Sequence, residues 1–327
     1  MRALIGVILV AAGLWAGYWF VGSRAALQAA EAVFANDGPV ELERDSLTIA
    51  GFPNRFDLTV TGLTASDPAT GIRWDSPEVQ LYSMSWKPWH LIAALNDPQT
   101  VTLPGQIVTL TPQRAIGSLV LVPGTDLTLD RVTVETGGIT AASSLGWAVR
   151  VDQLMFATRR AATPAFAHDV FAEASGLTPD ATLTAALSQA ELPPVAEVLR
   201  LDCSAAFSAA IDRHAAETAP VLTGITLKEG LLRWGDLTVF AKGDVAPDAE
   251  GLAVGRIDIK VTQWRKLVPV LVGAGVFTPE VAPTVTRALE LLSQQGADPD
   301  VLDVPLLFQS GRMSLGPLPL GVSPRLN

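Results

Sequence analysis

The sequence predicts a mainly β fold (α+β), in which an N-terminal transmembrane helix precedes curved antiparallel β-sheet lobes and a few packed helices. Three observations lead to this prediction. The chain begins with an uncharged apolar run, most of the remainder alternates apolar with polar residues, and Gly, Pro, Asp and Asn recur between the alternating stretches. Alternation with period two is typical of strands that have one apolar and one solvated face, as in antiparallel sheets.

Composition narrows the class of protein. The chain has 327 residues, with 23 Lys and Arg against 33 Asp and Glu, so its formal net charge is −10. Hydrophobic residues make up 49%, which is too many for a disordered chain. Because the chain is acidic and has no basic stripe, we expect it not to bind nucleic acid. Cys203 is the one cysteine, which excludes a disulfide within the chain.

Residues 3–22 form a run of 20 residues without charge. At about 1.5 Å per residue, such a helix crosses a hydrocarbon layer of about 30 Å. Trp15, Tyr18 and Trp19 lie near its end, where aromatic rings favour the membrane–water interface. We therefore assign residues 1–24 as a transmembrane anchor. A cleaved signal peptide is the alternative, with cleavage near Ala25 or Ala26, but its apolar region would be shorter and would end in small residues.

Positive charge around this run predicts its orientation. Arg2 and the terminal amine precede the run and Arg24 follows it, which favours a cytoplasmic N-terminus. The Ala-rich residues 25–36 predict a helical stalk that continues the anchor, and Asp37-Gly38-Pro39 would end it.

From residue 37 onward the period-two pattern predicts two β-rich lobes, residues 37–190 and 191–327. Residues 160–220 are Ala-rich with little periodicity, and the boundary is placed near Pro193-Pro194; a single lobe is the alternative. The predicted strands contain the alternating stretches 56–60, 79–81, 127–129, 149–151, 237–241, 257–261 and 302–308.

Three helices are predicted among these strands. Residues 88–95 form a short one, and residues 263–276 form a second that contains Pro269 and is therefore kinked or begins late. Residues 279–295 form the clearest, with Thr278 as its N-cap and Gly296 at its end.

The sequence contains no recognisable catalytic, cofactor-binding or metal-binding motif, so we expect a protein that is not an enzyme and has no cofactor. Its three histidines, His90, His168 and His214, lie dozens of residues apart. Aromatic and apolar residues are the candidates for contact with lipid or membrane. Trp86 and Trp89 either fill a core or form an amphipathic lip at lipid headgroups. The helix at 263–276 could likewise meet a bilayer through Trp264, Leu267 and Phe277.

Three stretches carry a resemblance to a known family. They are IAGFPNRFDL at 49–58, WGDLTVFAKGDVAPDAEGLAVGRIDI at 234–259 and GRMSLGPLPLG at 311–321. With the N-terminal run, they resemble domain-of-unknown-function family 2125, uncharacterised alphaproteobacterial membrane-anchored envelope proteins, over nearly the whole chain. That family has no assigned activity, so the resemblance implies no functional residue. More distantly, the plan is similar to envelope proteins of the AsmA type, which are associated with lipid movement through a curved β-sheet groove; this is an analogy of fold.

The resemblance implies a single-pass protein of the bacterial inner membrane with its body in the periplasm and the lipid bilayer as its partner. We expect the body to bind or guide lipid, such as a phospholipid, along an apolar sheet face in envelope biogenesis. The alternative is a non-catalytic structural or assembly protein of the inner membrane, whose sheet faces pack against each other into a closed core. Which lipid is bound, and whether the sheet face is open, stay undecided at this point.

Overall fold

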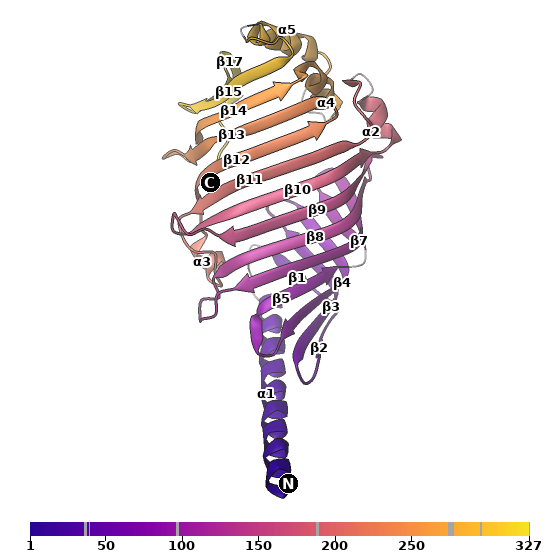
Figure 1. Ribbon diagram of the computed structural model, residues 1–327, viewed down its shortest axis with the longest axis vertical. Helices are drawn as coiled ribbons and strands as arrows, with labels where there is room; N and C mark the ends of the chain where they lie inside the picture. Colours follow the sequence, from indigo (N-terminus) through magenta and orange to yellow (C-terminus); the bar gives the residue numbers. More distant parts are fainter. Residues whose placement is uncertain are drawn as a thin grey trace.

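The computed structural model describes residues 1–35, 38, 40–95, 98–187, 190–273, 278–294 and 296–326. A long helix, α1 (Arg2–Phe34), projects from one end of an elongated body that consists mainly of one β-sheet (Figure 1). The mainly β fold predicted from the alternation is therefore confirmed, as is the long apolar N-terminal helix.

The strands follow one another along the chain with short connections. They are β1 (Glu41–Glu43), β2 (Ser46–Ala50), β3 (Arg55–Asp67), β4 (Ile72–Met84), β5 (Lys87–Leu95), β6 (Gln99–Leu103), β7 (Gln106–Leu121), β8 (Leu129–Ser143), β9 (Ala148–Arg160), β10 (Ala167–Pro179), β11 (Ala196–Phe207), β12 (Leu222–Trp234), β13 (Leu237–Pro247), β14 (Ala253–Thr262), β15 (Val301–Gln309), β16 (Arg312–Leu315) and β17 (Leu318–Val322). The helices of the body are α2 (Ala181–Ala186), α3 (Ala215–Thr218), a short 3-10 helix (Trp264–Lys266), α4 (Leu267–Gly273) and α5 (Ala282–Ser293).

The sheet is an antiparallel meander without crossovers. In the described part of the chain, all 17 strands belong to one sheet, and successive strands pair with each other in sequence order. Two positions hold broken strands: β1 and β2 both pair with β3, and β5 and β6 both lie between β4 and β7. Antiparallel neighbours joined by tight turns explain why the sequence alternates so regularly and why turn residues recur at close spacing.

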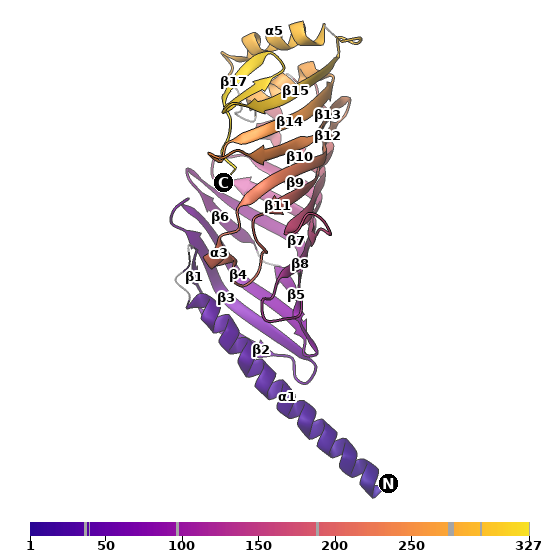
Figure 2. The same ribbon diagram turned by 90° about the vertical axis from the view of Figure 1, so that its left-hand side faces the viewer.

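The sheet curls along its length. The strands β3, β4 and β6 lie behind β7–β10 in Figure 1 and beside them in the perpendicular view of Figure 2. Glycines at strand kinks contribute to this curvature, since Gly62 in β3 and Gly138 in β8 have φ values of 60° and 54°. Register shifts further interrupt the ladders of β11 with β12 and of β12 with β13.

Helix α1 runs without a break through the predicted anchor and the predicted stalk. It is long and apolar enough to cross a membrane, and the residues of its N-terminal half are nearly all exposed. The helix ends at Phe34, where the Arg44 guanidinium lies 4.4 Å from the ring centroid. The predicted stop at Asp37 and Pro39 lies outside the described residues.

The predicted helix at 88–95 is wrong, because these residues form strand β5. Its backbone pairs with β4 on one side and with β7 on the other. These ladders pair residues 90–95 with β7 and residues 92–94 with β4, and the pairing outweighs the weak helical preference of a short Ala- and Leu-containing stretch. The ladder with β4 is irregular near Met84, close to Pro88, which has no N–H to donate.

The two C-terminal helices are confirmed with shorter bounds. The predicted helix at 263–276 is the short 3-10 helix followed by α4, which ends at Gly273; the four residues after it lie outside the described ones. The predicted helix at 279–295 begins only at Ala282, as α5. Its N-cap is Val281 rather than Thr278, whose carbonyl instead accepts the N–H groups of Val281 and Ala282 in a preceding turn.

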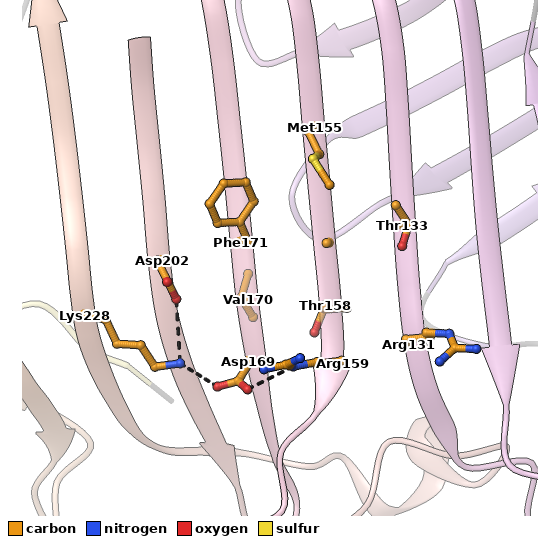
Figure 3. A pocket seen from close by; sticks show the side chains of 11 residues that line it. Arg131, Thr133, Met155, Thr158, Arg159, Asp169, Val170, Phe171, Asp202 and Lys228 are labelled. Carbon is orange, nitrogen blue, oxygen red and sulfur yellow. Dashed lines mark hydrogen bonds and ion pairs between the residues drawn. The ribbon is translucent and has the colours of Figure 1, made fainter.

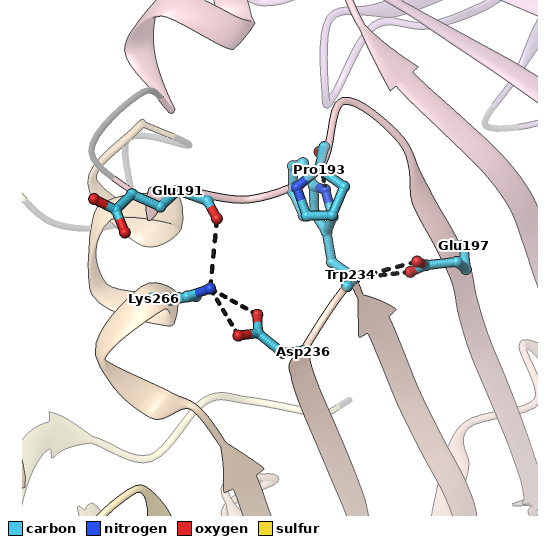
Figure 4. Close-up of polar contacts among 7 residues, drawn as sticks. Glu191, Pro193, Glu197, Trp234, Asp236 and Lys266 are labelled. Carbon is cyan, nitrogen blue, oxygen red and sulfur yellow. Dashed lines mark hydrogen bonds and ion pairs between the residues drawn. The ribbon is translucent and has the colours of Figure 1, made fainter.

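The stretch 160–220, whose pattern predicted little, contains the long strands β10 and β11. Polar contacts join the chain after α2 to the β12–β13 turn and the 3-10 helix (Figure 4). The Trp234 indole donates to the carbonyl of Pro193 at 2.7 Å, and the Glu197 carboxylate accepts the N–H of Gly235 at 2.9 Å. Lys266 Nζ binds Asp236 at 2.7 Å and lowers the pKa of its carboxyl. The division into lobes at residue 190 stays a prediction.

Candidate functional site

One face of the sheet carries an unbroken cross-strand row of apolar residues. Residues directly opposite each other in antiparallel strands point to the same face, so the register identifies the members of the row. In sheet order they are Ile49, Leu58, Leu81, Ala93, Gly117, Val134, Phe156, Ala172, Leu201, Gly230, Ala241, Ile259 and Val304. We call this set the apolar row and the side of the sheet that carries it the apolar face.

A parallel row on the same face widens the apolar surface. It includes Ala174, Leu199 and Leu232, which are paired across β10, β11 and β12. At the centre of the sheet, side chains of both rows are exposed to solvent: Phe156 and Leu201 of the apolar row are 37% and 42% exposed, and Leu199 of the parallel row is 49% exposed. Large apolar side chains that remain this exposed in a contiguous row are typical of a surface that binds another apolar molecule.

The end of the apolar face furthest from α1 is covered by helices. Trp264 and Val268, from the 3-10 helix and α4, pack with Leu289 of α5 against Val261 and Val304 of the sheet. Trp264 is fully buried, and its indole donates to the carbonyl of Pro299 at 3.0 Å. This cluster is the main hydrophobic core of the described residues, and it closes only the last part of the apolar face.

The opposite end of the apolar face lies against α1. Phe56 of β3, which alternates in phase with Leu58 of the apolar row, is buried beside Trp19 with ring centroids 6.2 Å apart. A Cβ added at Gly22 would lie 2.7 Å from the Phe56 ring, so the helix backbone approaches closely there. The apolar face is thus covered at both ends, by α1 and by α4 with α5, and its exposed part lies in between.

The other face of the sheet is polar and carries ion pairs between neighbouring strands. Asp169 lies between Lys228 Nζ at 2.7 Å and Arg159 Nε at 3.3 Å (Figure 3). The hydrogen bond from Lys228 holds the pKa of Asp169 below its ordinary value and raises that of Lys228. Arg200 similarly binds Glu173 at 2.6 Å and Glu229 at 3.1 Å.

These ion pairs are exposed to solvent, so this face of the sheet is hydrated. A depression of about 340 Å³ lies beside Asp169 and is lined by Phe171 and Met155 among others. Since Arg159 and Lys228 are exposed and both pair with Asp169 on a strand between them, the ion pairs mainly hold adjacent strands in register. Along the row itself the two faces therefore differ, with ion pairs on one side and apolar side chains on the other.

The lipid-contact candidates named from the sequence lie in two places. Trp86 is exposed in the β4–β5 turn, 6.4 Å from Trp15 of α1 between ring centroids. Trp89 is half-buried in β5 and alternates in phase with Ala93 of the apolar row. Trp264 is fully buried in the hydrophobic core under α4 and α5, so it has no surface that could contact a bilayer. Leu267 packs against the same core. Phe277 lies outside the described residues.

The central residues of the apolar row were missed from sequence. Leu199, Leu201 and Cys203 alternate with charged or polar residues, which is the signal that could have identified β11 within the stretch 160–220. In β9, Met155 lies between Leu154 and Phe156, so apolar–polar alternation gives no such signal there. Their shared face follows only from the register, which long-range pairing determines.

Titratable groups near this face are few. His168 is buried, and burial lowers its pKa, with Arg160 adding to the effect. Burial raises the pKa of the Cys203 thiol, which keeps it protonated and unreactive. Among the described residues, no three His, Cys, Asp or Glu side chains converge in a group that could hold a metal ion.

The arrangement defines a class: a β-sheet body with one open apolar face, attached to a helix that is able to span a membrane. The chain belongs to a family of uncharacterised bacterial proteins, whose model, described as "Uncharacterized protein conserved in bacteria (DUF2125)", matches residues 19–324. The family resemblance seen in the sequence is thereby confirmed. Neither the curated proteins nor the solved structures contain a match to the chain.

Proposed function

We propose that the protein is a single-pass protein of the bacterial inner membrane, with a cytoplasmic N-terminus and a periplasmic body that binds lipid acyl chains along the apolar row. Its role in envelope biogenesis is then to hold or guide lipid, without catalysis. The observation that carries this proposal is the continuity of the apolar row from β2 to β15, with its central side chains exposed.

The energetics favour an acyl chain as the ligand. Each CH₂ group that leaves water contributes about 0.8 kcal/mol, so a chain laid across several strands gains free energy without a single polar contact. The row also contains small residues, such as Ala172 and Gly230, between Phe156 and the end of the sheet that α4 and α5 cover. Such a surface favours long flexible apolar ligands over compact polar ones.

Retention of α1 is part of the proposal. Trp15, Tyr18 and Trp19 all donate hydrogen bonds to backbone carbonyls of the body, and cleavage near Ala25 would remove all three. A helix built into the body in this way fits a permanent anchor better than a signal peptide. Intact-mass measurement of the protein purified from membranes tests this directly, and a mature chain beginning after Ala25 would contradict it.

Lipid contact is tested by placing a photo-crosslinking amino acid at Phe156 and, separately, at Met155. These neighbours in β9 have similar exposure and point to opposite faces. After irradiation in living cells, we expect lipid adducts at position 156 and few at position 155. Equal labelling at the two positions, or no lipid adduct at 156, would contradict the proposal. The alternative, a structural or assembly protein, predicts protein adducts at 156 in place of lipid.

A further inference from the structure

The junction between α1 and the body lies inside the apolar run, residues 3–22, that would cross the bilayer. The first hydrogen bond from α1 to the body is made by Trp15, whose Nε1 donates to the carbonyl of Pro53 at 3.1 Å. Arg2 bounds the apolar run on one side, and the 12 uncharged residues between it and Trp15, residues 3–14, extend only about 18 Å. A helix that crosses a hydrocarbon layer of about 30 Å needs about 20 residues, and tilt increases that number.

Two turns of the sheet meet α1 along this same part of the helix. They are the β2–β3 turn, residues 51–54, and the β4–β5 turn, residues 85–86 (Figure 2). Tyr18 donates its hydroxyl to the carbonyl of Ser85 at 2.5 Å, and the Trp19 indole donates to the carbonyl of Arg55 at 2.6 Å. These two turns therefore lie at the same depth in the membrane as the final third of the apolar run.

The exposed side chains at the turns are suited to that depth. Phe52 is 56% exposed and Trp86 54%, and both extend the ring cluster of Trp15, Trp19 and Phe20. Aromatic rings are favoured at the headgroup level. Turn carbonyls would lose their water in this environment, and the hydrogen bonds from α1 replace it.

Two cations lie just after the turns. Arg55 follows the first and Lys87 the second; the Arg55 side chain is about half exposed and also pairs with Asp57 at 2.7 Å. Long basic side chains at this position can extend to lipid phosphates while their carbon chains stay against apolar surface.

We propose that the β2–β3 and β4–β5 turns are a second membrane contact, inserted into the periplasmic headgroup layer of the bilayer that α1 spans. The inference rests on the proposed membrane anchoring. It adds that the sheet starts inside the interface, so the first strands of the apolar row adjoin the lipid from which a ligand would come.

The test measures the depth of single labels in the full-length protein. The chain is reconstituted in nanodiscs of phosphatidylethanolamine and phosphatidylglycerol, with bimane at F52C or F166C in a Cys203→Ala background. Phe166 is a matched control, because it is an exposed aromatic residue in the β9–β10 connection, further along the sheet (Figure 1). Lipids that carry a spin label near the headgroup should quench the label at position 52 severalfold more than the label at 166. Equal quenching overturns the inference.

A readout without substitutions guards against misfolded variants. Hydroxyl-radical footprinting of the unmodified protein in the same nanodiscs should oxidise Phe52 and Trp86 severalfold less than Phe166; equal oxidation again overturns the inference. The result is separable from that of the proposed function. Lipid adducts at position 156 with an unquenched label at 52 would reject only the insertion of the turns. A quenched label at 52 without lipid adducts at 156 would reject only the lipid-binding role.

Discussion

Phe156 and Leu201 lie on either side of Ala172 in one cross-strand row, so two large exposed side chains flank a small one at the centre of the apolar face. This spacing leaves room for an apolar chain where the sheet has no covering helix.

We expect Leu201→Gln to lower the amount of bound lipid roughly tenfold, because a leucine side chain contributes about 1.5–3 kcal/mol when it is buried by a ligand. The measurement is native mass spectrometry of the gently extracted full-length protein. Leu231→Gln is the matched control, since Leu231 lies opposite Arg200 and hence on the polar face. An equal loss in both variants would show that the apolar face has no special role.

Trp19→Phe should destabilise the junction between α1 and the body by about 1 kcal/mol, because the ring is kept but its hydrogen bond to Arg55 is lost. Thermal unfolding of the detergent-solubilised protein measures this. Trp86→Phe, at an exposed position, should stay within about 0.5 kcal/mol. If the two variants unfold alike, the Trp19 hydrogen bond does not hold the helix to the sheet.

Leu289→Ala should cost about 2–5 kcal/mol, because Leu289 belongs to the core that covers the distal end of the apolar face. Leu291 lies two residues later on α5 and is exposed, so Leu291→Ala should change stability by about 0.5 kcal/mol or less. Denaturant unfolding distinguishes the two. A small effect of Leu289→Ala would mean that α5 packs only loosely.

Gly138→Ala should destabilise the sheet by about 1–2 kcal/mol, because an alanine at a φ of 54° is strained and its Cβ would lie 2.6 Å from the Gln113 side chain. The neighbouring Gly137→Ala is the control, since a Cβ there meets nothing within 4 Å. Both are compared by thermal unfolding. Equal stability of the two variants would argue against a rigid kink at Gly138.

The thermal stability of the protein should decrease at acidic pH, because the buried His168 ring becomes protonated. Burial holds the pKa of His168 below its ordinary 6.5, so the folded state favours the neutral ring. The contribution is fully present above about pH 6.5 and is lost as the pH falls from there toward the lower folded-state pKa. Between about pH 7.5 and 5.5, wild type should therefore lose more thermal stability than His168→Gln. Equal losses in wild type and His168→Gln would contradict this role of His168.

Sequence alone predicts the secondary structure best where one strand face is apolar and the other charged. The β13, β14 and β15 strands alternate over most of their length, and the residues predicted there, such as Val239, Ile259 and Val304, do lie on one face. β5 was mispredicted because its local composition suits a helix, and only pairing with β4 and β7 makes it a strand. The Ala-rich β10 gives weak alternation because alanine suits either environment.

The candidate site was harder to predict than the fold. Alternation predicts that each strand has an apolar face, but only the register of β10 with β9 and with β11 aligns Phe156 with Leu201. Which part of that face stays exposed depends on where α1 and α5 pack. Those contacts join residues such as Trp19 and Phe56, far apart in the chain, and no local pattern encodes them.

Because the sheet is a meander without crossovers, hairpins can be added or removed along the direction perpendicular to the strands. Each strand adds about 4.8 Å of sheet width, so inserting or deleting one hairpin changes the reach by about 10 Å and leaves the pairing of every other hairpin unaltered. The distance that the body extends from α1 is therefore a property that the number of strands can tune, independently of α1 and of the helices α4 and α5.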